Sequence, residues 1–354
     1  MPEHDFEQDP ESGQRPTEES GEGVIPHVPD SALLEQWNPE ASPLPAPIAE
    51  SGNPGLVSQS AESQSDPQAA GQPLFQSFTQ PEIRPPVRMP HLGHVGILAV
   101  FSLFGLLCAS ALIFSALHFH LFGVSTQQEA VTDVHYALGS EVVLYLLMFG
   151  ACLLFFPLIW HKGLFAGLQW NGAIAFKMRQ RLFIIAAICS GLALVNGFLL
   201  PSPTDAPIDK IFRAPGAAWL LFAFGVTFAP FFEEMVFRGF LLPALCTACD
   251  WIHERITGAA VRPLDQNGQP QWSLNAMIIA SIATSLPFAL MHGAQTGYSW
   301  GPLVLLVGVS LVLCWARLST RSLAASVLVH ASYNFLLFSL MMLGTGGFRH
   351  LERM

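Results

Sequence analysis

Long apolar runs alternate with short polar stretches along most of the chain, beginning near residue 94. A helix that crosses the hydrocarbon core of a bilayer needs about 20 predominantly apolar residues. Seven runs approach that length, and one missed helix would make eight. The pattern therefore predicts an all-α, polytopic transmembrane bundle of about seven helices, or eight. The expected spans are 94–117, 136–160, 182–200, 220–245, 275–297, 302–316 and 322–344.

The first 90 residues follow a different pattern. They contain fifteen Asp and Glu against three Arg and no Lys, are rich in Pro, Ser and Gln, and have no sustained apolar periodicity. Such a segment cannot bury enough apolar surface to offset the entropy lost on ordering. We therefore expect a disordered acidic N-terminal tail over residues 1–90. Transmembrane helices over 91–180, a second helical region over 181–345 and a C-terminal tail over 346–354 complete the expected organisation.

The composition supports a membrane protein in contact with lipid. Hydrophobic residues make up 51% of the chain and charged residues only 12%, and we expect no nucleic-acid partner. The six cysteines lie almost wholly in apolar runs, which predicts no disulfide framework. Ten Lys and Arg, including Arg317 and Arg321, fall in the loops on the same side of the membrane as the N-terminal tail. Four fall in the loops on the opposite side. This bias places the N-terminal tail on the cytoplasmic side.

Polar side chains inside membrane helices are rare, and they are functional candidates by default. Three of the predicted helices hold most of them. Glu141, near the start of the second span, is expected at the membrane interface and is set aside. The candidate site residues are Glu233, Glu234 and Arg238 on the fourth helix, His292 on the fifth, and His330 and Asn334 on the seventh.

Helical spacing organises these residues. Glu234 and Arg238 are separated by four positions, so they lie on one stripe of the helix and can pair. Glu233 is rotated by about 100° from Glu234 and points elsewhere. His330 and Asn334 also have the four-residue spacing. We expect the three helices to bring these side chains to a shared, wet pocket inside the bilayer.

Three short motifs carry a resemblance to a known family. EEMVFR at 233–238, FALMH at 288–292 and HASYN at 330–334 resemble the signatures EExxxR, FxxxH and HxxxN of the CPBP family of intramembrane proteases. That family includes the type II CAAX prenyl endopeptidases and the bacterial lysostaphin-resistance and abortive-infection-like proteins. The resemblance covers about residues 180–345 and extends to Gly308, Arg317 and the SLAASVLVH run. It identifies 181–345 as a protease core of the CPBP type.

The resemblance also implies roles for the motif residues. Glu233 resembles a general base that activates water, and His292 resembles a residue that helps to bind that water or a metal ion. Glu234 and Arg238 resemble a supporting ion pair. Peptide hydrolysis needs a nucleophile, a proton acceptor and a cradle for the oxyanion. No Ser-His-Asp or Cys-His set is evident, so we expect water to be the nucleophile.

Two mechanisms remain open for His330 and Asn334. In one, Glu233, His292 and His330 bind Zn²⁺ with an open fourth position that activates water. In the other, Glu233 activates water without a metal while His330 and Asn334 stabilise the oxyanion. The chain has no HExxH helix, which is the strongest zinc signature of metalloproteases.

The expected function is that of an intramembrane endopeptidase, a metalloprotease of the CAAX prenyl type. Its expected partners are membrane lipids and a peptide or membrane-anchored protein substrate, prenylated proteins among them. The family implies a bacterial plasma membrane. Two alternatives belong to other classes: a non-catalytic membrane protein that binds a peptide toxin and confers immunity, and an ion-coupled transporter with a Glu, Arg and His relay. The absence of an internal repeat speaks against the transporter.

Overall fold

The computed structural model of the chain describes residues 88–200, 211–212, 216–266 and 268–349. The predicted disordered tail therefore lies outside the described residues except for its last three. Within the described ranges the chain forms helices and no β-strand, and its single β-bridge joins Leu264 to Pro270. The prediction of an all-α bundle is confirmed.

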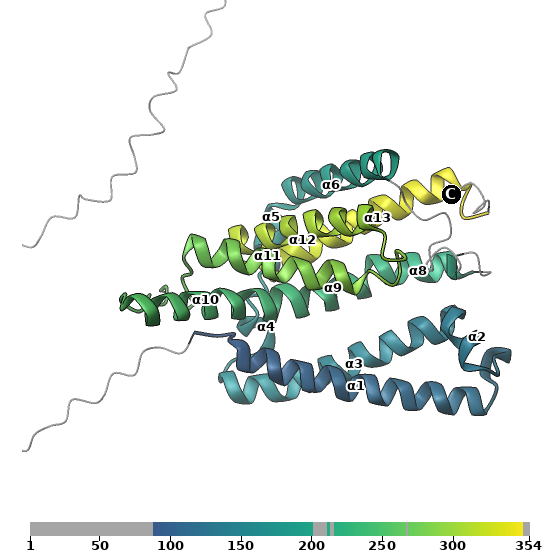
Figure 1. The fold of residues 1–354 in the computed structure, drawn as a ribbon, viewed down its shortest axis with the longest axis horizontal. Coiled ribbons are helices and arrows are strands. Elements are labelled where there is room, and N and C mark those ends of the chain that lie inside the picture. The colour runs from purple at the N-terminus through teal and green to yellow at the C-terminus, as the bar shows by residue number, and fades with distance from the viewer. Residues whose placement is uncertain (1–87, 201–210, 213–215, 267, 350–354) are drawn as a thin grey trace, which may run out of the picture. The chain divides into compact units, whose positions relative to one another are not determined.

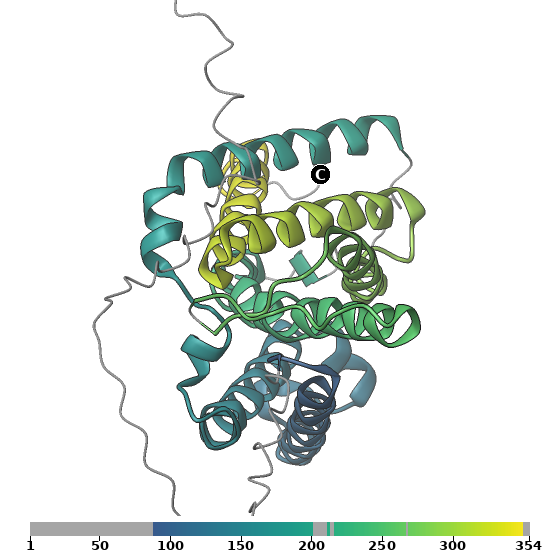
Figure 2. The same ribbon diagram turned by 90° about the vertical axis from the view of Figure 1, so that its left-hand side faces the viewer.

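The helices form a bundle whose long axes run in several directions (Figures 1 and 2). They are α1 (Leu92–His118), η1 (Leu121–Gly123), α2 (Gln127–Thr132), α3 (Val134–Trp160), α4 (Leu164–Gly167), α5 (Gly172–Lys177), α6 (Arg179–Leu199), α8 (Ala217–Val226), α9 (Phe228–Glu234), η2 (Met235–Leu241), α10 (Leu242–Thr257), α11 (Leu274–Met291), α12 (Trp300–Thr320) and α13 (Leu323–Gly344).

Seven helical runs in the described residues are long and apolar enough to cross a membrane. Six of them are single helices, namely α1, α3, α6, α11, α12 and α13, and the seventh is the continuous run Ala217–Thr257 that contains α8, α9, η2 and α10. This number agrees with the sequence prediction and supports an integral membrane protein. The side of the membrane on which the tail lies and the domain boundary at residue 180 stay predictions.

Three predicted helix ends were wrong. The fourth run, expected over 220–245, extends to Thr257 because the polar residues after Cys249 continue the helix to a left-handed Gly258 with φ 68°. The fifth, expected to reach 297, ends at Met291, and the chain then turns through Gly297 and Tyr298, which both have positive φ. The sixth is longer than the expected 302–316, because α12 continues past Arg317 to Thr320.

Two views of the bundle show which helices lie together (Figures 1 and 2). Helices α1 and α3 pack along each other at one side of the bundle, and α6 lies at the opposite side against α13 and α12. The run α8–α10 lies between these groups, where α1 and α3 contact it, and α11 packs against both α10 and α12. The helices that carry the three motifs therefore occupy the middle of the molecule.

The long run changes its winding near the double glutamate. Thr227 has φ −115° and ψ −67° and separates α8 from α9. Pro230 in the first turn of α9 has no backbone N–H to donate. The segment η2, directly after Glu234, is a π-helix of seven residues. Because π-helical turns inside α-helices occur frequently at functional sites, the backbone at η2 also indicates a functional site.

An aromatic cluster joins α3 to η2. Phe156 lies with its ring centroid 4.6 Å from that of Trp160 and 4.7 Å from that of Phe240, which belongs to η2. The indole N–H of Trp160 donates to Nε2 of His94 on α1, at 3.1 Å. Buried rings with satisfied polar atoms are strong packing elements. This cluster therefore fixes α1 and α3 against the long run.

Candidate active site

Glu233 lies at the end of α9 with most of its side chain buried. Its Oε2 atom is buried and accepts no hydrogen bond from the described residues. Two ring nitrogens face this oxygen: Nε2 of His292 at 3.7 Å and Nε2 of His330 at 3.9 Å. Side chains from three separate helical segments thus meet at one point, as the motif spacing predicts.

Glu234 points to a different partner set. Its Oε1 accepts a hydrogen bond from Nη1 of Arg238 at 2.9 Å and another from Nδ1 of His330 at 2.9 Å. Both Glu234 and Arg238 are fully buried. Nη2 of Arg238 also donates to the Oγ and the carbonyl oxygen of Ser310, at 2.6 and 3.0 Å. The predicted i,i+4 pair is present, and it connects η2 with α12 and α13.

Phe288 explains the phenylalanine of the second motif. Its buried ring lies under the guanidinium of Arg238, whose central carbon is 4.4 Å from the ring centroid. The same ring lies 4.9 Å from the ring of His292 and 5.8 Å from that of His330. A cation over an aromatic face is attracted by the quadrupole of the ring. Phe288 therefore packs against the arginine and against both imidazoles.

The hydrogen bonds of both histidines assign their tautomers. Nδ1 of His292 lies 2.8 Å from the carbonyl oxygen of Phe288, and Nδ1 of His330 lies 2.9 Å from the carboxylate of Glu234. A carbonyl or carboxylate oxygen accepts, so each Nδ1 carries a proton, and in a neutral ring the lone pair is on Nε2. Three acceptors, the two Nε2 atoms and Oε2 of Glu233, then converge without a donor. A water molecule has the two donors that such a place requires.

His292 is held at a helix end instead of inside a helix, which corrects the predicted fifth span. It is the C-cap of α11. The opposite end of α11 is anchored because Asp250 of α10 accepts from the backbone N–H and hydroxyl of Ser273, at 2.9 and 2.6 Å. Gly293 follows, and a Cβ there would lie 2.7 Å from the ring of Tyr298. A larger residue at position 293 would therefore require the ring of Tyr298 to move.

Asn334 makes a contact that the spacing did not predict. Its Nδ2 donates to the carbonyl oxygen of Gly225 near the end of α8, at 2.7 Å. His330, one turn earlier on α13, bonds to Glu234 instead. The two residues therefore share a helix face without a hydrogen bond between them. One amide N–H of Asn334 remains for another acceptor.

The three predicted zinc ligands lie near one another but slightly farther apart than the ligand atoms of a bound Zn²⁺. Among the described residues, no group of three or more His, Cys, Asp or Glu side chains is arranged to hold one. Ligand atoms around a tetrahedral Zn²⁺ lie about 3.4 Å from each other. Oε2 of Glu233 is 3.7 and 3.9 Å from the two Nε2 atoms. Zn²⁺ at Glu233, His292 and His330 stays a prediction.

One residue was misplaced by the sequence prediction. Arg317, predicted in a cytoplasmic loop, is 2% exposed within α12, where its Nε donates to the carbonyl oxygen of Arg238 at 3.1 Å. The predicted sixth span was one residue too short to include it. Glu141 is partly exposed within α3, and its place at the membrane interface stays a prediction.

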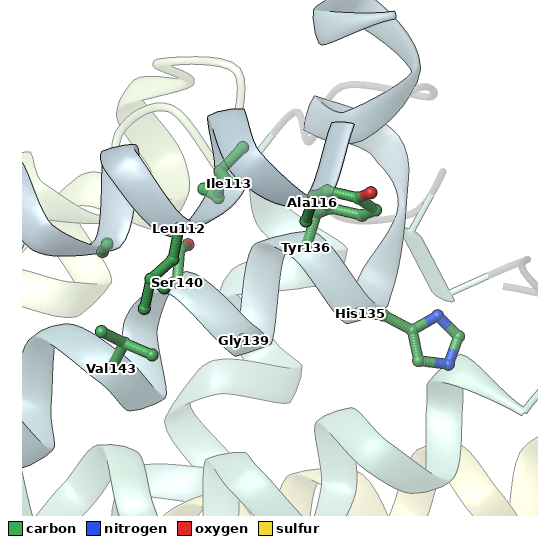
Figure 3. Close-up of a pocket in the computed structure, with 9 residues that line it drawn as sticks. Leu112, Ile113, Ala116, His135, Tyr136, Gly139, Ser140 and Val143 are labelled. Atoms are coloured by element: carbon green, nitrogen blue, oxygen red, sulfur yellow. The ribbon is translucent and has the colours of Figure 1, made fainter. Parts of the chain in front are cut away.

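Three cavities lie away from the motif residues. One of about 190 Å³ lies between α1 and α3 and is lined mostly by small and apolar residues, with His135 and Tyr136 at one end (Figure 3). A second of about 410 Å³ lies between α6 and α12, and a polar one of about 370 Å³ is lined by residues near Trp170 and Arg321. The site around Glu233 is therefore defined by its side chains and not by one of these cavities.

Comparison with known proteins gives one match. Residues 215–336 match the model of a family described as Rce1-like, type II CAAX prenyl endopeptidase. No curated protein and no solved structure matches the chain. The matched stretch runs from the start of α8 into α13 and contains all six candidate site residues, while α1, α3 and α6 lie outside it. This match supports a CPBP/CAAX protease family for the part of the chain that carries the three motifs.

Proposed function

We propose that this protein hydrolyses peptide bonds of membrane-associated protein substrates, including prenylated CAAX-type ones, with a water molecule activated by Glu233. The convergence of three acceptor atoms, Oε2 of Glu233 and Nε2 of His292 and His330, carries the proposal. A water molecule held there would donate one hydrogen to the carboxylate and one to an imidazole. Its lone pair would then be free for the substrate carbonyl carbon.

The protons of the proposed reaction are accounted for by these residues and the water molecule. Glu233 accepts a proton as the water oxygen bonds to the carbonyl carbon, and it returns this proton to the amide nitrogen as the C–N bond breaks. His292 and His330 orient the water from Nε2. The remaining amide N–H of Asn334 can donate to the oxyanion. Glu234 and Arg238 hold His330 and the backbone in place without contacting the reacting atoms.

The test is cleavage of a library of membrane peptides, with and without a lipid anchor, by the purified full chain in proteoliposomes. We expect Glu233→Gln to lower kcat by a factor on the order of 10² to 10⁴, the usual contribution of a general base. Glu129→Gln, which changes an exposed carboxylate of α2, is the matched control and should keep its activity. Cleavage by Glu233→Gln at the wild-type rate would contradict the proposal.

The same assay separates the alternatives. A chelator should leave the rate unchanged, because the proposed mechanism uses no metal. Loss of activity with a chelator and its recovery with Zn²⁺ would replace the mechanism with that of a His₂Glu metal site. Peptide binding without cleavage in the wild-type protein would favour the immunity-type alternative.

A further inference from the structure

A polar stripe of α3 includes a ring that packs on α9, next to Glu233 in the sequence. Glu141 and Tyr145 are one helical turn apart and therefore share a face of α3. The ring of Tyr145 stacks on that of Phe232, with centroids 4.7 Å apart and planes inclined by 16°. It also lies parallel to the ring of Phe224, at 6.2 Å. Because Phe232 directly precedes Glu233, this stacking fixes Tyr145 beside the base.

The two polar groups of the stripe have no partner in the described part of the chain. Neither the hydroxyl of Tyr145 nor the carboxylate of Glu141 makes a hydrogen bond or ion pair there, and both residues keep partial exposure. An unpaired carboxylate inside a membrane helix is costly unless it faces water or a polar ligand. Water or a polar ligand is therefore expected beside this stripe.

The motif residues leave one requirement of the reaction poorly met. They present acceptors to the water, but the oxyanion of a tetrahedral intermediate needs hydrogen-bond donors. Nη1 and Nη2 of Arg238 donate to Glu234 and Ser310, and Asn334 has already given one N–H to Gly225. A hydroxyl beside Glu233 would add a second donor to the remaining N–H of Asn334.

We propose that α3 forms a fourth wall of the active site and that the hydroxyl of Tyr145 donates a hydrogen bond to the substrate carbonyl oxygen as it becomes an oxyanion. This inference rests on the proposed function. It makes Tyr145 a catalytic residue that lies outside the stretch matched by the family model. The donor is in place before the substrate arrives, because the stack on Phe232 orients the ring.

The experiment compares Tyr145→Phe with Tyr136→Phe in the full chain. Both variants remove a hydroxyl from α3, but that of Tyr136 donates to the carbonyl oxygen of Leu121 at 3.0 Å, away from Glu233. Phenylalanine keeps the ring that stacks on Phe232. We expect Tyr145→Phe to lower kcat about 10- to 100-fold with KM unchanged, as loss of one oxyanion donor does. Tyr136→Phe should behave like the wild type.

Binding of a peptide phosphinate, a tetrahedral anion that resembles the intermediate, gives a second readout. Tyr145→Phe should weaken phosphinate binding by the same factor as kcat, and it should leave substrate binding to the Glu233→Gln background unchanged. A kcat within twofold of the wild type would overturn the inference. So would equal losses of substrate and phosphinate binding, which would mean that Tyr145 only shapes the pocket. If Glu233→Gln is fully active, the proposed function fails whatever Tyr145→Phe does.

Discussion

The helix pair α1 and α3 and the motif-bearing helices are held together by different kinds of contact. Between α3 and η2, the aromatic rings of Phe156, Trp160 and Phe240 pack closely. Between η2, α12 and α13, the contacts are hydrogen bonds of the buried charges Glu234 and Arg238. The interface with α3 is thus mostly apolar, whereas the interface with α12 and α13 has buried charges surrounded by apolar side chains.

This difference suggests how a membrane bundle can be stable and also have one defined arrangement of its helices. Lipid tails are as apolar as the side chains they would replace, so apolar contacts between membrane helices define rotation only through shape. A buried charge with directed hydrogen bonds tolerates much less movement, because each lost partner leaves an uncompensated charge. We infer that the ionic contacts set the geometry around Glu233 and that the aromatic contacts support it.

The largest expected effect tests the ionic interface. Arg238→Met removes one partner of the buried pair and leaves Glu234 without its strongest counter-charge. We expect the free energy of unfolding in mixed detergent micelles to fall by about 3–5 kcal/mol. The double variant Glu234→Gln with Arg238→Met removes both charges and should regain part of this loss.

Arg321→Met is the matched control for this variant. Arg321 also pairs with a carboxylate, that of Asp265 at 2.6 Å, but its side chain is 53% exposed. Exposed pairs contribute about 0–1 kcal/mol, so a small loss is expected. Equal losses in Arg238→Met and Arg321→Met would remove the basis of the comparison between the two interfaces.

A smaller effect sharpens the same comparison on one hydrogen bond. Ser310→Ala deletes the hydroxyl that accepts from Nη2 of Arg238 at 2.6 Å. Hydrogen bonds to charged groups contribute about 1.5–3 kcal/mol, and the unfolding free energy should fall by that amount. Ser319→Ala on the same helix is the control, since its hydroxyl makes only a 3.4 Å bond to the carbonyl oxygen of Ala316. If both variants lose the same unfolding free energy, the hydrogen bond to Arg238 contributes no more to stability than the weak bond of Ser319.

The smallest effect is expected in the aromatic interface. Phe156→Leu keeps an apolar side chain but leaves part of a fully buried volume empty. We expect a loss of about 1–2 kcal/mol in unfolding free energy, with kcat/KM unchanged in the cleavage assay. Phe104→Leu, at a ring that is 58% exposed on α1, should change neither. A large drop in kcat/KM for Phe156→Leu would mean that the aromatic cluster sets the site geometry as well.

The sequence predicted the membrane spans and the Glu234–Arg238 pair because both depend on local periodicity. Apolar runs of about 20 residues and a four-residue spacing are readable without knowing how helices pack. The positions of His292 and Asn334 were harder to predict from the sequence. The first depends on a turn beginning at Gly293, and the second on the carbonyl of Gly225, which is 109 positions away in the sequence.

Glu141 and Arg317 show a different limit. Each lies near the end of a predicted span, where charged residues are usually interfacial. Whether such a side chain turns inward depends on the neighbouring helix, and here α8–α10 lies against both α3 and α12. Sequence spacing alone could not distinguish a side chain that faces the interior of the bundle from one that lies at the membrane surface.

The π-helical turn at η2 has a consequence for insertions and deletions. A helix that gains one residue can accommodate it by widening locally, so that the segments on either side keep their rotation. Removing one residue from Met235–Leu241 would close the widened turn and draw α10 toward α9 by about 1.5 Å, with both segments still facing their present neighbours. The stretch that carries Arg238 is thus the part of the long run whose length can change with the least disturbance to its two ends.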